Sequence, residues 1–297
     1  MKVFVTGATG VLGRAAVSAL LHDGHAVTGL ARSEAKAAEL AEAGADAVQV
    51  SLFDQAGLTE AFRGFDAVAN LATHMPIGVA GIRPGAWKVN DRVRVEGSKI
   101  VVQAAHDAGV RRLVQESVSF LYADAGDEWI TEDSTLSVTR SLDPAAVAEA
   151  NVMAFACKSR QPVVLRFGNF IGDDPMTTWR LAQARAGRPI GVGDPQGWAH
   201  LVHPDDAGSA VSSALDAQGG VYNVGAEPIR RQDMTCVFAR SVGRDRVGFM
   251  PRLLVRVGGD RLAPLTRSHR VSSDKLHEAT GWKPWHDVFD ESWLNVA

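Results

Sequence analysis

Three glycines that could bind a phosphate group stand near the start of the chain. Gly7, Gly10 and Gly13 follow a short apolar run, Lys2 to Val5, and precede a segment whose apolar residues recur at helical spacing. Glycines in such a strand-to-helix turn permit a tight turn, a close backbone approach to a pyrophosphate, and close packing of the helix on the strand. The free N–H groups of the helix would attract the phosphates. The residues predicted to bind a dinucleotide here are Gly7, Thr9, Gly10, Val11, Leu12 and Gly13.

The type of dinucleotide is indicated at the end of the next predicted strand, His25 to Ala31. Arg32 and Ser33 follow this strand, where the adenosine ribose would lie. A carboxylate at this position would bind both ribose hydroxyls, whereas an arginine accommodates a 2′-phosphate. Because Arg32 is present and the acid is absent, the sequence predicts NADP rather than NAD. The alternative is an ordinary surface arginine at the start of the next helix.

Strands and helices alternate at short spacing through the first half of the chain. This alternation predicts an α/β fold, a Rossmann-type doubly wound parallel sheet with right-handed crossovers. We expect residues 1–168 to form the dinucleotide-binding domain and residues 169–297 a smaller, substrate-covering α/β region, with segments around 199–225 returning to the sheet. The remaining predicted strands are 47–50, 66–72, 112–119, 162–167 and 221–224, and the main predicted helices are 11–23, 34–43, 89–108 and about 144–156.

Ligands of open α/β sheets bind outside the carboxyl ends of the strands. Glu116 stands at such an end, where it could bind a group on the nicotinamide side, act as an acid, or make structural hydrogen bonds. The further residues predicted to contact the cofactor are Ser51, Leu52, Leu71, Ala72, Ser117, Phe167, Asn169 and Phe170.

Several segments complete the pattern of a known family. They are Thr6 to Gly13, Asn70 to Ala72, Ser117 to Tyr122, Leu165 to Gly172, Val202 to Asp206, Tyr222 to Gly225, and Ser273 to Pro284. With them, nearly the whole chain resembles the extended short-chain dehydrogenase/reductase superfamily, in its epimerase/dehydratase branch. The resemblance implies a nicotinamide cofactor, a small-molecule substrate and a possible homodimer, and it says less about the reaction.

The acid–base pair of that family is a tyrosine and a lysine four residues later, on the helix before the sixth strand. Aligned on Ala148-Glu149, the tyrosine position falls on Ser141 and the lysine position on Ala145. The serine or threonine of the family falls on Val118. The chain has only two tyrosines, and neither is followed by a lysine at the fourth position. It therefore resembles an atypical member that lacks the usual proton-transfer groups.

Three other side chains could move a proton. Ser119 lies one residue beyond the missing serine and could hydrogen-bond a substrate oxygen, or the backbone instead. His74 follows the fourth strand, where nicotinamide and substrate should meet, although it could be an ordinary surface histidine. Tyr122 lies in the same loop as Ser119, with a packed phenol as the alternative. Water is a further possible source.

Composition excludes several classes of protein. The formal net charge of −3 gives no electrostatic reason to expect nucleic acid or an anionic membrane as a partner. No apolar run approaches the roughly 18 residues that span a bilayer, so we expect a cytoplasmic protein. His200 and His203 are expected on opposite faces of a strand, which predicts no metal site, and Asp205 or Asp206 is expected to cap the next helix. Cys157 is expected to be a small core residue of a helix.

The favoured function is an NADP(H)-binding oxidoreductase or redox-neutral isomerase/dehydratase that acts on a small organic substrate. The missing acid–base pair motivates an alternative, a cofactor-binding sensor or scaffold protein without catalysis. An NAD-dependent sugar epimerase is the third candidate, and it is disfavoured because that chemistry relies on the absent tyrosine.

Overall fold

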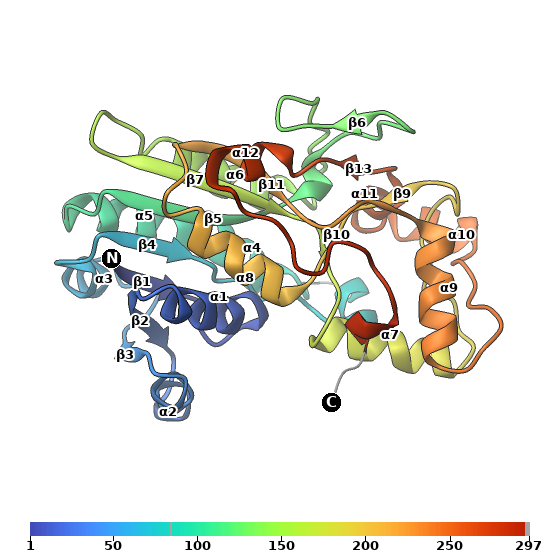
Figure 1. Ribbon diagram of the computed structural model, residues 1–297, viewed down its shortest axis with the longest axis horizontal. Coiled ribbons are helices and arrows are strands. Elements are labelled where there is room, and N and C mark those ends of the chain that lie inside the picture. Colours follow the sequence, from blue (N-terminus) through green and yellow to red (C-terminus); the bar gives the residue numbers. More distant parts are fainter. Residues whose placement is uncertain (84, 295–297) are drawn as a thin grey trace.

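A sheet of seven parallel strands forms the centre of the computed structural model, which describes residues 1–83 and 85–294 (Figure 1). The strand order is β3-β2-β1-β4-β5-β7-β11. This order confirms the predicted Rossmann-type fold, because the chain leaves β1 in both directions and makes a crevice at the carboxyl edge there. The strands are β1 (Lys2–Thr6), β2 (Ala26–Ala31), β3 (Asp46–Gln49), β4 (Ala67–Asn70), β5 (Arg112–Val118), β7 (Gln161–Phe167) and β11 (Gly220–Val224).

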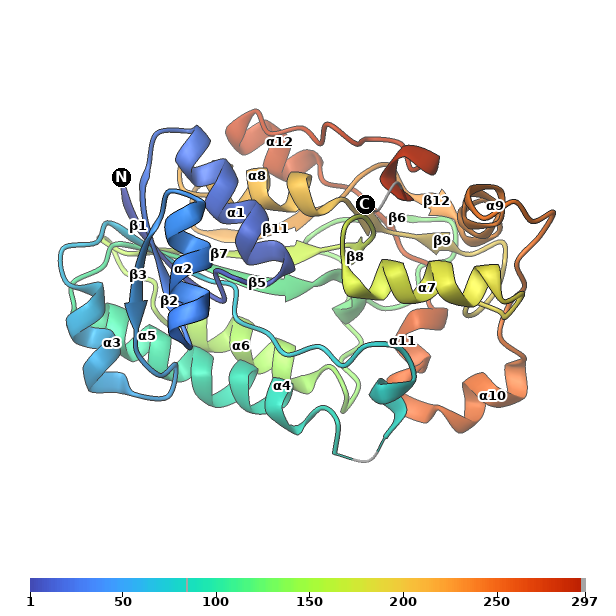
Figure 2. The same ribbon diagram turned by 90° about the horizontal axis from the view of Figure 1, so that it is seen from below.

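Helices cover both faces of this sheet (Figure 2). One face carries α1 (Val11–His22), α2 (Glu34–Glu42), α8 (Pro204–Ser213) and α12 (Asp274–Thr280). The other carries α3 (Gln55–Phe62), α5 (Ser98–Asp107) and α6 (Asp143–Met153).

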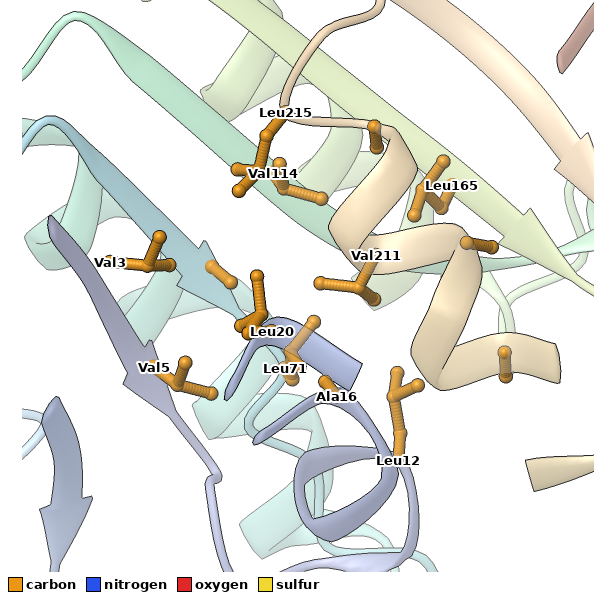
Figure 3. Close-up of a cluster of buried hydrophobic side chains, with 14 of the residues drawn as sticks. Val3, Val5, Leu12, Ala16, Leu20, Leu71, Val114, Leu165, Val211 and Leu215 are labelled. Carbon is orange, nitrogen blue, oxygen red and sulfur yellow. The ribbon is translucent and has the colours of Figure 1, made fainter. Parts of the chain in front are cut away.

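The strand residues alternate between these two helical layers. On β1, Val3 and Val5 point toward α1 and α8, whereas Phe4 packs among the residues of α3 and α5. Figure 3 shows the first cluster, in which Leu20 of α1 and Val211 of α8 lie over the sheet. Helices α1 and α8 are in close contact, because a β-carbon at Gly208 would lie 2.4 Å from the backbone of Ala15. This packing fixes the helix that follows the glycine turn.

The segment predicted as one helix over 89–108 is interrupted. It consists of α4 (Lys88–Arg92), a π-helical turn (η2, Val93–Gly97) and α5. In the π turn, the carbonyl of Val95 accepts a hydrogen bond from Asn151 of α6 at 3.3 Å. The apolar stripe predicted from Val89 is wrong at that residue, whose side chain is exposed. The π turn changes which side chains face the sheet.

Two further expectations are corrected. Helix α6 ends at Met153, so Cys157 lies outside it and is exposed rather than part of the core. The segment from 124 to 140, for which the sequence predicts neither a strand nor a helix, contains the short strand β6 (Trp129–Ile130), which pairs with β13 (Arg270–Val271). The strand β6 depends on a partner distant in sequence, whereas Cys157 pairs with Arg160 in a local turn.

The remaining elements gather beyond the carboxyl ends of β5 and β7 (Figure 2). None of the helices in the described part of the chain is long and apolar enough to cross a membrane. The elements beyond the ends of β5 and β7 are β8 (Asn169–Phe170) paired with β10 (Leu201–Val202), β9 (Trp198–Ala199) paired with β12 (Ile229–Arg230), α7 (Pro175–Arg185), α9 (Arg231–Ser241), α10 (Arg252–Val257), α11 (Ala263–Thr266), and the short helices η1 (Gly78–Ile82), η3 (Ser119–Leu121), η4 (Gly259–Arg261) and η5 (Glu291–Leu294).

Candidate functional site

Two glycines of the first turn have no room for a side chain. Gly7 adopts a left-handed conformation with a φ of 68°, and a β-carbon there would lie 2.7 Å from the backbone of Ala72. A β-carbon at Gly13 would lie 2.0 Å from the carbonyl oxygen of Gly7. These contacts bring β1, α1 and the end of β4 together, as the spacing of the glycines requires.

Gly10 is different, because its outer side is open. A β-carbon there would meet only the carbonyl oxygen of Gly7, at 3.2 Å. Gly10 is also the N-cap of α1, and no side chain caps the first-turn N–H groups of that helix. An exposed, uncapped helix N-terminus with a bare glycine beside it fits the pyrophosphate of a dinucleotide. Leu12 is buried in the core, so only its backbone could take part.

Arg32 is exposed at the end of β2 and has no hydrogen bond or ion pair with any residue that the structure describes. The hydroxyl of the neighbouring Ser33 accepts a hydrogen bond of 3.4 Å from the backbone N–H of Lys36 and so caps α2. Ser33 therefore serves the helix, whereas the guanidinium of Arg32 is free to bind an anion.

Four further residues predicted to contact the cofactor make contacts within the protein. The hydroxyl of Ser51 accepts a hydrogen bond from the N–H of Phe53 at 3.2 Å. The side chain of Leu52 packs against Gly97 in the π turn. Leu71 is buried and Ala72 partly buried, directly beneath the Gly7 turn. The structure thus brings Leu71 and Ala72 to the first glycine, which lies 64 residues or more away in the chain.

A buried polar chain links the carboxyl ends of three strands. Thr6 donates to Asn70 Oδ1 at 2.6 Å, and Asn70 Nδ2 donates to Gln115 Oε1 at 2.8 Å. These residues lie opposite one another in the parallel register of β1, β4 and β5. Each amide has a partner, which holds the strand ends at a fixed spacing beneath the site. The sequence prediction did not include this chain of hydrogen bonds.

Two buried ion pairs engage the predicted residues of β5. Glu116 Oε1 accepts from Arg94 Nη2 at 2.8 Å, and Ser117 donates to Glu149 Oε1 at 2.5 Å. Glu149 also pairs with Arg166 at 2.7 Å. Within the described residues, Arg94 Nη1 and Glu116 Oε2 are buried without a hydrogen-bond partner. Glu116 therefore pairs with Arg94 through Oε1, while its Oε2 has no hydrogen-bond partner among the described residues.

The positions of the family's acid–base pair hold no titratable group. Ser141 is a partly buried serine whose hydroxyl is hydrogen-bonded within the protein, and Ala145 is buried in α6. Val118 is partly buried at the end of β5. Neither Ala145 nor Val118 has a polar side chain, and the hydroxyl of Ser141 is already engaged with the carbonyl of Asp260.

Ser119 lies against a histidine from a distant segment. Its hydroxyl is 3.0 Å from Nδ1 of His200, and both side chains are buried. Burial, with a smaller effect of nearby His269, lowers the pKa of His200 to about 3, so the imidazole is neutral. This serine–histidine pair is enclosed behind the loop that follows β5.

Tyr122 is placed where it cannot act as predicted. Its ring is fully buried, and its hydroxyl donates to Asn223 Oδ1 at 2.8 Å. Burial raises the pKa of the phenol, with the charge of Arg166 acting in the opposite direction. The phenol therefore has no exposed donor for a substrate, which corrects the catalytic role considered from the sequence.

His74 remains accessible. Its backbone N–H donates to Asn90 Oδ1 at 3.1 Å, and its side chain is exposed just after Leu71 and Ala72. In the described part of the chain, no hydrogen bond engages its ring. The imidazole is therefore free to turn toward a ligand at the end of β4.

The segment after β7 carries the last group of predicted residues. Phe167 is buried, and its ring centroid lies 5.7 Å from that of Phe170. Asn169 pairs with Leu201 in β10, and its side-chain oxygen accepts from Arg180 of α7 at 3.2 Å. Arg180 was not among the residues predicted from the sequence.

One cluster has the residue types of a metal site. Ligand atoms of His203, Asp206 and His286 lie within 4.8 Å of one another. Both oxygens of Asp206, however, already accept backbone N–H groups, from Trp285 at 2.8 Å and His286 at 3.0 Å. The cap of α8 is His203, so the capping role expected for Asp205 or Asp206 is wrong. Asp206 instead fastens the C-terminal segment to α8.

The chain is similar to known proteins over most of its length. Residues 3–225 match the model of the NAD dependent epimerase/dehydratase family. A 3-diazoavenalumate denitrifying reductase from a Streptomyces species is 30% identical over 96% of this chain and 97% of its own. A 2-alkyl-3-oxoalkanoate reductase from Stenotrophomonas maltophilia is 27% identical over 90% and 84% of the two chains. Human epimerase family protein SDR39U1, solved with NADPH, superposes with a TM-score of 0.80 at 21% identity, covering 99% of this chain and 98% of that chain.

Proposed function

The chain belongs to the NAD dependent epimerase/dehydratase family, and we propose that it is an NADPH-dependent reductase of a small organic substrate. The observation that carries the proposal is the combination of an open glycine turn with a vacant acid–base position. Gly10 leaves the helix N-terminus free for phosphate, while Ser141 and Ala145 offer no base. Such a site can hold a hydride donor but lacks the group that abstracts protons in the redox-neutral members.

NADP is proposed over NAD because of Arg32. The guanidinium is exposed at the end of β2, where the adenosine ribose of a dinucleotide lies in this fold. Its freedom from ion pairs within the described residues leaves all of its donors available to a 2′-phosphate. The resemblance to a protein solved with NADPH agrees with this assignment but does not decide it.

The cofactor would supply a hydride from C4 of its nicotinamide ring. Gly7, Gly10 and Gly13 would hold the pyrophosphate, so that the reactive end extends over the ends of β4, β5 and β7. Leu71, Ala72, Phe167, Asn169 and Phe170 would border the nicotinamide, and the ion pair of Glu116 with Arg94 lies at the same edge. The contribution of these residues is to orient two reactants and to exclude water.

The proton that accompanies the hydride has two proposed sources in the chain. His74 is exposed at the end of β4 and can carry a proton between solvent and substrate. Ser119 would need its loop to open, because His200 holds its hydroxyl in the interior. Water can replace either group, since a reductase needs a proton only once in each turnover, whereas an epimerase must remove one and return it.

The relatives whose names describe reductases support this choice over isomerisation. One observation favours a second candidate, a cofactor-binding sensor. The hydroxyl of Ser141 donates to the carbonyl of Asp260, and the buried hydroxyl of Tyr122 donates to Asn223. Two hydroxyls near the expected reaction centre thus make structural hydrogen bonds. A sugar epimerase is the least supported, because no phenol is available to act as its base.

A direct experiment tests the proposal. Purified protein is titrated with NADPH and with NADH, and NADPH consumption is then followed with a panel of ketones, enones and diazo compounds. We expect NADPH to bind more tightly than NADH and at least one class of substrate to be reduced with matching product. Tight NADPH binding without turnover of any class would favour the sensor, and failure to bind either cofactor would contradict both functions.

A further inference from the structure

Arg180 extends from α7 toward the segment that follows β7. Its Nη2 donates to Asn169 Oδ1 at 3.2 Å, and its Nη1 donates to the carbonyl of Phe170 at 3.5 Å. Both acceptors are neutral, and both bonds are long. Asn169 and Phe170 stand at the carboxyl edge of the sheet, and α7 lies beyond the ends of β5 and β7 (Figure 2). The guanidinium thus lies on the substrate side of the proposed site.

Arg180 has no counter-ion, in contrast to Arg94 and Arg166. Arg94 pairs with Glu116 at 2.8 Å and Arg166 pairs with Glu149 at 2.7 Å. No carboxylate of the described residues lies within ion-pair distance of Arg180, although its side chain is only partly exposed. Leaving a partly buried charge without a partner is unfavourable, and an anion bound from outside would remove part of that cost.

The nearest acid is already committed to another role. Asp174 is the N-cap of α7, where its Oδ1 accepts the N–H groups of Met176 at 2.8 Å and Thr177 at 3.0 Å. Its Oδ2 accepts the hydroxyl of Thr177 at 2.5 Å. Burial lowers the pKa of Arg180, and the charge of Asp174 offsets this only in part. Asp174 therefore stabilises the helix and leaves the guanidinium unpaired.

The phosphates of a dinucleotide are too far away to be this anion. They would lie at the start of α1, after β1, whereas Arg180 contacts the segment after β7. Strands β4 and β5 stand between, so β1 and β7 are three strand spacings apart, about 14 Å. The 2′-phosphate expected at Arg32 lies on the far side of β1, at the end of β2. An anion bound by Arg180 would therefore belong to the other reactant.

We propose that Arg180 binds a carboxylate of the substrate, which makes the substrate class an organic acid. This inference rests on the proposed reductase function for its substrate, but not for the binding event. The guanidinium has five N–H donors, of which two are used, so it retains donors for a carboxylate. The adjacent Trp179 packs against Gly78 of η1, whose β-carbon would lie 2.5 Å from the indole ring. Helix α7 and η1 thus form one wall beside the anion.

The test compares acids with their neutral amides. Binding of 2-oxo and 3-oxo acids and of the corresponding amides is measured by calorimetry on the full chain, with and without NADP⁺. The proteins are the wild type, Arg180→Gln, Arg180→Lys, and Arg185→Gln. Arg185 is a matched control, because it is exposed on the same helix and carries the same charge. NADPH affinity is recorded for each protein as a measure of intact folding.

We expect the wild type to bind acids at least tenfold more tightly than amides. Arg180→Gln should weaken acid binding by about 30-fold or more and leave amide binding unchanged. Arg180→Lys should retain part of the preference, and Arg185→Gln all of it. A wild type without acid preference, or an Arg180→Gln protein that keeps it, would overturn the inference. Because binding is measured without turnover, absence of NADPH oxidation would count against the reductase and not against Arg180.

Discussion

The hydroxyl of Ser141 donates a hydrogen bond of 2.6 Å to the carbonyl oxygen of Asp260, 119 residues later in the chain. The alignment on Ala148-Glu149 predicts that Ser141 takes the position of the family's catalytic tyrosine, and Asp260 belongs to η4. The hydroxyl of Ser141 therefore connects the segment before α6 to a distant part of the chain. The reaction centre of this protein must be built from other groups.

Restoring the family's lysine should destabilise the protein. Ala145 is buried in α6, so Ala145→Lys would place an ammonium group where the described residues provide a small apolar site. We expect a loss of about 3 kcal/mol or more in the free energy of unfolding, measured by urea denaturation. The matched control is Ala150→Lys, exposed on the same helix, which should change stability by less than about 0.5 kcal/mol. Equal effects of the two variants would contradict the burial of this position.

Substitutions at two glycines of the turn should have different effects, one on cofactor binding and the other on folding. Gly10→Ala should fold, because its β-carbon meets only one atom at 3.2 Å, yet the methyl group should weaken NADPH binding about tenfold or more. Gly13→Ala should destabilise the fold itself, since its β-carbon would lie 2.0 Å from the carbonyl of Gly7. Thermal unfolding and NADPH titration measure the two effects.

Gly248→Ala is the control for these substitutions, because nothing lies within 4 Å of a β-carbon at that exposed position. It should change neither the melting temperature nor NADPH affinity by more than experimental error. Normal NADPH binding by a folded Gly10→Ala protein would exclude the turn as the pyrophosphate site.

Arg32→Glu should reverse the choice of cofactor. A carboxylate at the end of β2 would repel a 2′-phosphate and accept the ribose hydroxyls of NADH. The Kd for NADPH should rise about tenfold or more, which corresponds to roughly 1.4 kcal/mol, while the Kd for NADH stays constant or falls. Fluorescence titration with both cofactors measures this, and NADH serves as the internal control for folding. Parallel weakening of both cofactors would show that Arg32 does not read the 2′-phosphate.

Tyr122→Phe should affect stability and spare catalysis. The phenol donates to Asn223 in the core, so its removal leaves a buried carbonyl oxygen unsatisfied at a cost of about 1–3 kcal/mol. Turnover by the folded fraction should change less than threefold. Removal of a true general acid would lower kcat by about 10²- to 10⁴-fold, and a decrease of that size would restore Tyr122 to the mechanism.

Stability should fall as the pH drops below about 6.5. Burial lowers the pKa of His200 to about 3 and that of His269 to about 4. In the unfolded chain both imidazoles have a pKa near 6.5. Between pH 6.5 and about 4, the unfolded state therefore binds protons that the folded state does not bind. Each histidine should therefore remove about 1.4 kcal/mol of stability per pH unit across this window.

Urea unfolding between pH 4.5 and 7.5 measures this slope. His269→Gln, whose amide can still reach the carbonyl of Tyr122, should reduce the slope by about one proton. His277→Gln is a control, since His277 is only partly buried in α12. An unchanged slope in the His269→Gln protein would mean that this histidine is already protonated in the folded state.

Local patterns in the sequence determined the sheet and the dinucleotide turn. Gly7, Gly10 and Gly13 act within seven residues of one another, and the continuous apolar run of β1 can be recognised from its own side chains. Interactions of this range follow from backbone conformation and residue size, which the sequence displays directly. The absence of the tyrosine–lysine pair at Ser141 and Ala145 was equally visible.

Only the tertiary structure decided which polar side chains are free to act. Tyr122 is hydrogen-bonded to Asn223, 101 residues away, and Ser119 to His200, 81 residues away. Arg180 could not be selected from the sequence, because an arginine on a polar helix is ordinary until its neighbours are known to include no carboxylate. Partners that meet only when separate segments fold together set the charge and the exposure of a side chain, and these decide whether it stabilises the protein or serves a ligand.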